Sequence, residues 1–199
     1  METKNYTQEK VLALLLKEPF ATHTATSTAK ALSITRQGIW KILGKLAEDK
    51  LIDLEPISKT KTGTAIIKLN WSNPVTEKTL SLILTKEAIK QQKWRVGFGE
   101  LENNTDFLIL FGSILTQPKE ANDVDLLAIT NKKSFKAVEE IIIKIQKTQL
   151  KKIHFIDLIA DEFSQELKKQ NKAYIDAVKK GIVLYGQDNF IQFIRNLQK

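Results

Sequence analysis

One segment constrains the fold of this chain more than any other: two strand-like apolar runs, of which the second carries a pair of aspartates. The first run is 106–111, DFLILF, and a Gly-Ser pair follows it directly. Nine residues after that pair comes 123–129, DVDLLAI. Continuous apolar runs of this length are typical of buried strands. Because side chains alternate along a strand, we expect Asp123 and Asp125 on one face, a few ångströms apart.

The aspartate pair and the Gly-Ser pair together predict a phosphate-binding metal site. Two close carboxylates repel each other, which favours a compensating cation. Mg²⁺ prefers oxygen ligands and usually shares its coordination shell with substrate phosphates. Gly112 would let the backbone approach a triphosphate closely, and the Ser113 hydroxyl with nearby amides would hold its phosphates. The sequence therefore predicts that Asp123 and Asp125 bind Mg²⁺ beside a nucleoside triphosphate.

The same segment resembles the nucleotidyltransferase superfamily that includes DNA polymerase beta and kanamycin nucleotidyltransferase. The resemblance is closest to its small prokaryotic members and covers roughly residues 95–195. It rests on LFGSILTQPKEANDVDLLAI and on the tail GIVLYG at 181–186. It implies that Gly112 and Ser113 bind the nucleotide and that Asp123 and Asp125 hold the metal ion. A nucleotidyl transfer to a hydroxyl group is the reaction that it implies.

Two departures from the family pattern bear on activity. The small members usually read Gly-Ser-x-Ala-Arg-Gly, whereas Thr116 and Gln117 stand at the Arg and Gly positions here. The family's third carboxylate is expected on a strand at 152–159, and the resemblance places His154 at its position. His154 could be a base, a weak metal ligand or a structural residue.

Asp157 is the only carboxylate in that expected strand. It lies three residues after His154, and an odd spacing turns it to the opposite face. Asp157 could therefore serve only if the strand slips or bends. The candidate catalytic residues are Asp123, Asp125 and His154, and turnover is expected to be weak or absent.

Charge divides the chain unevenly. The net charge is +8, and residues 1–95 carry 16 Lys and Arg against 9 Asp and Glu, while residues 96–199 carry 15 against 14. Such asymmetry suggests a nucleic-acid-binding module beside a module of another kind, although a solvated lysine-rich surface has the same composition. The absence of Cys excludes disulfides, thiolate metal sites and a Cys nucleophile.

The basic half reads as helices followed by a hairpin. Apolar spacing and capping residues predict helices at 8–17, 29–32 and 35–50. Two β-prone runs then surround a Lys/Thr/Gly loop. TAKALSITRQGIWKILGKLAEDKLIDLEP resembles the winged helix-turn-helix of prokaryotic transcription regulators. Candidate DNA contacts lie on the third helix and the hairpin loop: Arg36, Gln37, Trp40, Lys41, Lys45, Lys59 and Lys61. A protein-interaction module, with Trp40 as a packing residue, is the alternative.

The expected fold class is α+β, with an N-terminal winged helix and a C-terminal nucleotidyltransferase-like mixed sheet flanked by helices. We expect domains at 1–72 and 96–199, joined by a connecting helix within 73–95. LNWSNPVTEKTLSLIL in this joint looks like the connection in archaeal proteins that fuse the two modules. One long helix at 163–181, capped by Gly181, and a final helix at 189–197 complete the expectation.

Two functions stay open at this point. The first is a DNA-binding transcription regulator whose second domain binds a nucleoside triphosphate and Mg²⁺ with weak or no turnover. The alternative is an active nucleotidyltransferase that transfers NMP to a protein, RNA or small-molecule hydroxyl, and the role of antitoxin in a toxin-antitoxin pair is open beside it. We expect a cytoplasmic protein without a membrane span, and a homodimer, because paired half-sites require two recognition helices.

Overall fold

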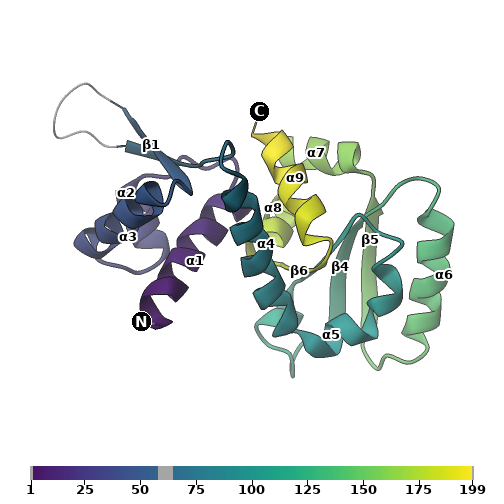
Figure 1. Ribbon diagram of the computed structural model, residues 1–199. Helices are drawn as coiled ribbons and strands as arrows, with labels where there is room; N and C mark the ends of the chain where they lie inside the picture. Colours follow the sequence, from purple (N-terminus) through teal and green to yellow (C-terminus); the bar gives the residue numbers. More distant parts are fainter. Residues whose placement is uncertain (1, 58–64, 199) are drawn as a thin grey trace. The chain divides into compact units, whose positions relative to one another are not determined.

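The computed structural model describes residues 2–57 and 65–198 (Figure 1). The chain divides into two compact units: an N-terminal unit, Met1–Ile83 with Gln198–Lys199, and a C-terminal unit, Leu84–Leu197. The division falls inside helix α4 (Pro74–Ile89), within the connecting segment that the sequence predicts. Among the helices of the described residues, none combines the length and apolar character needed to cross a bilayer.

Before α4, the described residues of the N-terminal unit form three helices and a two-stranded antiparallel sheet. Its elements are α1 (Glu2–Lys17), α2 (Ala25–Ala31), α3 (Arg36–Glu48), β1 (Ile52–Pro56) and β2 (Ala65–Leu69). Helix α1 ends two residues before Pro19, because the residue that precedes a proline is disfavoured in helical geometry. Ile39, Leu43 and Leu46 turn one side of α3 into the core. The opposite side of α3 is therefore left to solvent.

The start of α2 differs from the sequence prediction. The sequence places this helix at 29–32, capped by Ser27 or Thr28, whereas α2 begins at Ala25 with Thr24 as its N-cap. The Thr24 hydroxyl accepts a hydrogen bond from the Ser27 amide at 3.2 Å, and the Ser27 hydroxyl accepts one from the Thr24 amide at 2.8 Å. This capping box satisfies two amides that a helix start leaves unpaired, so the helix begins one turn earlier.

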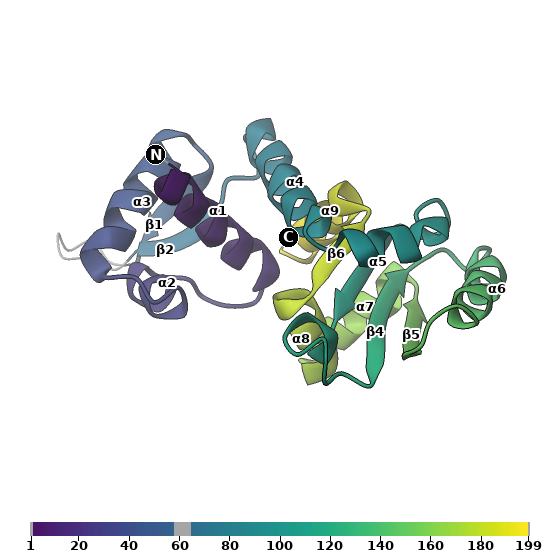
Figure 2. The same cartoon turned by 90° about the horizontal axis from the view of Figure 1, so that it is seen from below.

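The C-terminal unit is a mixed four-stranded sheet with helices on both faces (Figures 1 and 2). Strand β4 is antiparallel to β3 and parallel to β5, and β6 is antiparallel to β3, which gives the order β5-β4-β3-β6. The mixed sheet confirms the α+β class expected from the sequence. The elements in chain order are α5 (Gln92–Gly97), η1 (Gly99–Leu101), β3 (Phe107–Phe111), η2 (Ser113–Leu115), β4 (Asp123–Ile129), α6 (Phe135–Gln146), β5 (Lys152–Leu158), α7 (Ala160–Lys168), α8 (Lys172–Lys180), β6 (Ile182–Tyr185) and α9 (Gln187–Leu197).

Each face of this sheet has its own core. On one face, Leu108, Val124 and Leu126 share a buried cluster with Trp94 of α5 and Val138 of α6. On the other face, the ring of Phe107 meets three aromatic rings from α7 and α9, which belong to Phe163, Phe190 and Phe193. The alternation of side chains along the strands assigns neighbouring residues to opposite cores.

The single helix predicted at 163–181 is wrong, because two helices occupy that region. Helix α7 ends at Lys168 and α8 begins at Lys172. Between them Gln170 has φ +58°, a left-handed conformation that interrupts helical hydrogen bonding. The Asn171 side chain then caps α8 by accepting a hydrogen bond from the Ala173 amide at 3.3 Å. Gly181 is the C-cap of α8, as the sequence predicts.

Candidate metal centre

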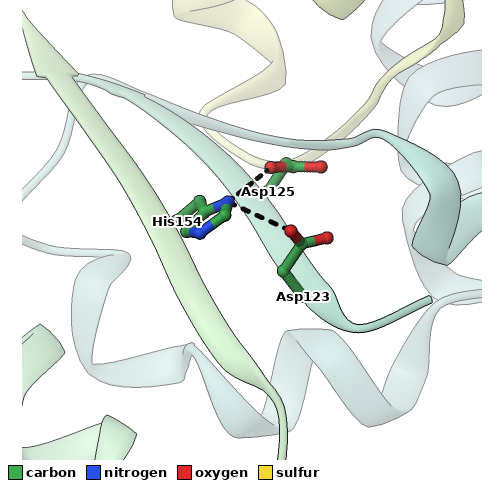
Figure 3. Close-up of side chains that lie close together, drawn as sticks. All are labelled: Asp123, Asp125 and His154. Carbon is green, nitrogen blue, oxygen red and sulfur yellow. Dashed lines mark ion pairs between the residues drawn. The ribbon is translucent and has the colours of Figure 1, made fainter.

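Asp123, Asp125 and His154 meet at one end of the sheet, where β4 and β5 begin. The two strands run parallel, and their register places Asp125 directly opposite His154. Asp123 and Asp125 alternate with the buried Val124, so both carboxylates lie on the same face of β4. Figure 3 shows the imidazole of His154 directed at both carboxylates. This arrangement brings together the three candidate catalytic residues that the sequence predicts.

The three side chains lie within reach of a single ion. The Nδ1 atom of His154 is 3.2 Å from Oδ2 of Asp123 and 3.5 Å from Oδ1 of Asp125. One ligand atom from each residue lies within 4.8 Å of the other two, so the cluster could hold a metal ion. The side chains are partly exposed, at 47% for His154, 31% for Asp123 and 24% for Asp125. A bound ion would therefore keep coordination positions open to solvent or to a ligand.

The electrostatics of the cluster favour a cation. Burial raises the pKa of Asp125, the charge of Asp123 raises this pKa further, and His154 lowers it. The ionised form of Asp125 is thus disfavoured by loss of water and, to a smaller extent, by repulsion from Asp123. A divalent cation would favour that ionised form. Asp125 thus has both the position and the electrostatic environment of a metal ligand, and Asp123 has the position.

Gly112 directly follows β3 and lies beside Asp125. Phe111 pairs with Asp125 in the β3–β4 ladder, and Gly112 then adopts φ +81°, which favours glycine. A Cβ atom added at Gly112 would overlap the Asp125 carboxylate. The glycine is therefore needed for the carboxylate to occupy its place. Ser113, the other predicted nucleotide contact, is exposed at the first position of η2 on the same strand end.

Asp157 does not join the cluster. Strand β5 runs in continuous register with β4, and Asp157 pairs with Ala128 without a slip or a bend. Its carboxylate accepts a hydrogen bond of 2.5 Å from the Thr130 hydroxyl. It lines a cavity with residues of α6 and with Ile153 and Phe155, on the opposite face from His154. The carboxylate that the sequence left as an alternative to His154 is thus turned away from the aspartate pair.

A cavity of about 440 Å³ adjoins Gly112, and sequence reasoning missed part of its lining. Besides the β3 end, it is lined by Thr116 and by Asp176 and Lys180 of α8. Lys180 pairs with Asp176 at 3.1 Å and is largely exposed. The signal in the sequence was the Lys-Lys pair just before the GIVLYG tail, which indicated only a favourable helix end. The volume suits a small-molecule ligand.

The candidate DNA contacts on α3 share its exposed side. They are Arg36, Gln37, Trp40, Lys41 and Lys45, all exposed in the N-terminal unit. The buried residues of α3 lie on the opposite side, so the cationic face is not needed for the core of this unit. Lys59 and Lys61, the candidate contacts on the hairpin loop, lie outside the described residues.

Comparisons with known proteins add no family assignment. No family model matches the chain, and neither the curated proteins nor the solved structures compared with it include a match. The functional argument therefore rests on the geometry of the two units.

Proposed function

We propose that this chain is a DNA-binding regulator whose C-terminal unit binds a nucleoside triphosphate together with a divalent cation. The observation that carries the proposal is the convergence of Asp123, Asp125 and His154 beside Gly112. In this proposal the C-terminal unit has the nucleotidyltransferase-like fold, and Asp123 and Asp125 hold the cation. The cation would neutralise the phosphates of the nucleotide and fix their orientation. Mg²⁺ is the ion that the aspartate pair by itself suggests.

The cavity beside Gly112 supports a nucleotide as the ligand. Gly112 lacks a side chain where the backbone must come near the phosphates, and Ser113 offers a hydroxyl and an amide at the same turn. Lys180 places a cation at the cavity wall, where it can pair with a phosphate oxygen. These groups line a cavity beside the turn at Gly112, which lies against the Asp125 carboxylate.

The N-terminal unit is proposed to be a winged helix that binds DNA. Three helices followed by a two-stranded antiparallel sheet have the element order of that fold. In this proposal α3 enters the major groove, where base edges can be distinguished, and Arg36 and Lys41 contact bases or phosphates. The exposed cations and Trp40 on one side of α3 support the assignment.

An active nucleotidyltransferase is the second candidate, and the contact between His154 and both aspartates favours it. In that reaction an acceptor hydroxyl oxygen would attack the α-phosphorus, its proton would pass to His154, and the bond to the departing pyrophosphate would break. The absence of a carboxylate at the His154 position is the reason to expect weak turnover. A protein, an RNA or a small molecule could provide the hydroxyl.

One incubation experiment separates the two functions. The wild-type chain and the double variant Asp123→Ala/Asp125→Ala are each incubated with labelled ATP, Mg²⁺ and candidate acceptors. The regulator predicts metal-dependent nucleotide binding that the double variant loses, with no labelled acceptor. If an acceptor is labelled by the wild-type chain but not by the double variant, the chain is an active nucleotidyltransferase, and the proposal of a regulator without turnover is wrong. Absence of nucleotide binding with Mg²⁺, Co²⁺ and Zn²⁺ alike would contradict both.

DNA binding is tested separately by the dependence of affinity on salt. Removal of one phosphate contact by Arg36→Ala or Lys41→Ala should reduce the slope of log affinity against log salt by about one. Lys172→Ala, on α8 of the C-terminal unit, removes the same charge without touching the proposed interface. Unchanged slopes in both α3 variants would contradict the assignment of α3 as the recognition helix.

A further inference from the structure

The donor set of the metal cluster differs from the one that Mg²⁺ prefers. Two of its three ligand atoms are carboxylate oxygens, and the third is an imidazole nitrogen. Mg²⁺ binds oxygen donors in octahedral geometry and loses its water reluctantly. Imidazole suits zinc, copper, iron and nickel ions. The chemistry of His154 therefore bears directly on which ion the cluster selects.

The observed separations suit three ligands on one ion. Donor atoms that lie about 2.1 Å from a metal are about 3.0 Å apart in octahedral geometry and about 3.4 Å apart in tetrahedral geometry. His154 Nδ1 is 3.2 Å and 3.5 Å from the nearest oxygens of Asp123 and Asp125. The imidazole nitrogen is thus placed where it could share one ion with both acids.

The strand register places His154 beside Asp125. Asp125 and His154 are register partners in the continuous parallel ladder of β4 and β5. The space on the other side of the Asp125 carboxylate is occupied by the backbone at Gly112, where even a Cβ atom would overlap it. The three donors are therefore held by strands rather than by loops, and a preformed site of this kind discriminates between ions by ligand type.

We propose that Asp123, Asp125 and His154 form a site for a divalent transition-metal ion, and that His154 makes the site select such an ion over Mg²⁺. This inference rests on the proposed function, because it names the ion of the same nucleotide site. With its Nδ1 atom on the ion, His154 does not serve as the base of a transfer reaction, which favours the regulator over the enzyme. The exposed side of the cluster leaves positions for phosphate oxygens.

Ion binding to the full-length chain tests the selection, with Co²⁺, Zn²⁺ and Mg²⁺ titrated by calorimetry in the absence of nucleotide. We expect the wild-type chain to bind Co²⁺ and Zn²⁺ at least about tenfold more tightly than Mg²⁺. His154→Asp creates an all-oxygen site and should lower Co²⁺ and Zn²⁺ affinity by about 10- to 100-fold. The same substitution should strengthen Mg²⁺ binding, so the ratio of affinities reports the role of the imidazole independently of any effect on folding.

The sequence supplies a matched control. The chain has two histidines and no cysteine, so His23 is its only other imidazole. His23 is buried in the N-terminal unit, where its Nε2 lies 3.1 Å from the Glu18 carbonyl oxygen. His23→Gln should leave ion affinities and the visible spectrum of bound Co²⁺ unchanged. Loss of the Co²⁺ spectrum in His23→Gln but not in His154→Asp would overturn the inference.

The outcomes also separate this inference from the proposed function. Mg²⁺ affinity equal to that of Co²⁺ in the wild-type chain, or an unchanged affinity ratio in His154→Asp, overturns the inference. If ATP with Mg²⁺ still binds and needs Asp123 and Asp125, the proposed function stands without it. If no ion binds, with or without ATP, both fail.

Discussion

At the scale of single residues, Asp157 shows that the register of a strand determines which of its side chains reaches a site. Sequence spacing predicts correctly that it faces away from the aspartate pair, because three positions separate it from His154. Whether β5 slips or bends could not be predicted, since register is set by pairing with β4. The continuous ladder keeps His154, and not Asp157, beside the acids. Alternation thus predicted the aspartate pair and the resemblance predicted His154, whereas the contact of His154 with both acids needed the register.

Replacement of Asp157 by asparagine should stabilise the protein at neutral pH. Burial raises the pKa of Asp157, the Thr130 hydrogen bond lowers it, and Glu162 raises it. Because the folded state binds this proton more tightly than the unfolded state, stability falls as the pH rises through the raised pKa. Asp157→Asn should therefore gain roughly a few tenths of a kcal/mol at pH 7, a small gain because solvent screens the charge. Urea unfolding at several pH values measures it.

The gain should vanish below the ordinary pKa of an aspartate, where the wild-type carboxyl is protonated in both states. Ion affinity in Asp157→Asn should equal that of the wild-type chain, because this side chain lies on the other face of the sheet. A large loss of ion binding would place Asp157 among the ligands after all.

Gly112 should tolerate no side chain. Its φ of +81° and the overlap of an added Cβ with Asp125 predict that Gly112→Ala destabilises the C-terminal unit by about 1–3 kcal/mol. The displaced Asp125 carboxylate should also lower ion affinity. Gly97→Ala is the control, because a Cβ there would meet only the Gln149 side chain at 3.6 Å. Thermal unfolding and ion titration of both variants measure the difference, and equal behaviour would contradict this account of the turn.

At the scale of elements, α3 contains a glycine that its own unit does not require. Gly44 lies inside the helix on the exposed side, one turn after Trp40, and a Cβ there would have no neighbour within 4 Å. A glycine inside a helix costs about 1 kcal/mol relative to alanine. No packing within the described residues accounts for that cost. Close approach of a partner to α3 would account for it.

Gly44→Ala should therefore have opposite effects on stability and on DNA binding. We expect the free energy of unfolding to rise by about 1 kcal/mol. We expect DNA affinity to fall by roughly tenfold, which corresponds to about 1.4 kcal/mol. Chemical denaturation and a fluorescence-anisotropy titration on DNA measure the two changes.

Gly38→Ala is the matched control, since a Cβ there would lie 3.0 Å from the Thr35 hydroxyl that caps the helix. It should bring no gain in stability. A stability gain in Gly44→Ala without any loss of affinity would mean that α3 does not meet DNA at this turn.

Helix ends were predicted well where a single residue determines them, and poorly where they depend on packing between two elements. Thr35 and Pro19 marked the start of α3 and the end of α1 from the sequence alone. The break between α7 and α8 could not be predicted, because Gln170 has no strong preference for its left-handed conformation. Tertiary packing of Phe163 and Tyr174 against each other across the break supports the two separate helices.

At the scale of the whole molecule, the two units have separate cores and separate proposed ligands. An ion that binds only the folded C-terminal unit stabilises that unit by about 2.7 kcal/mol at a concentration 100 times its dissociation constant. We expect calorimetry of the full-length chain to show one unfolding transition that moves up with added Co²⁺ and one that does not. Asp123→Ala/Asp125→Ala should abolish the shift. A shift of both transitions by the same amount would indicate that the units unfold together.

The parallel pairing of β4 with β5 has a consequence for the order in which the binding site appears during folding. The two strands are joined through α6, so the carboxylates and the imidazole come from parts of the chain about thirty residues apart. Strands separated in this way along the chain pair slowly, because the intervening segment must lose conformational entropy before the contacts between the strands form. Where this pairing forms only after the folding barrier, a bound ion leaves the refolding rate unchanged and lengthens the lifetime of the native state.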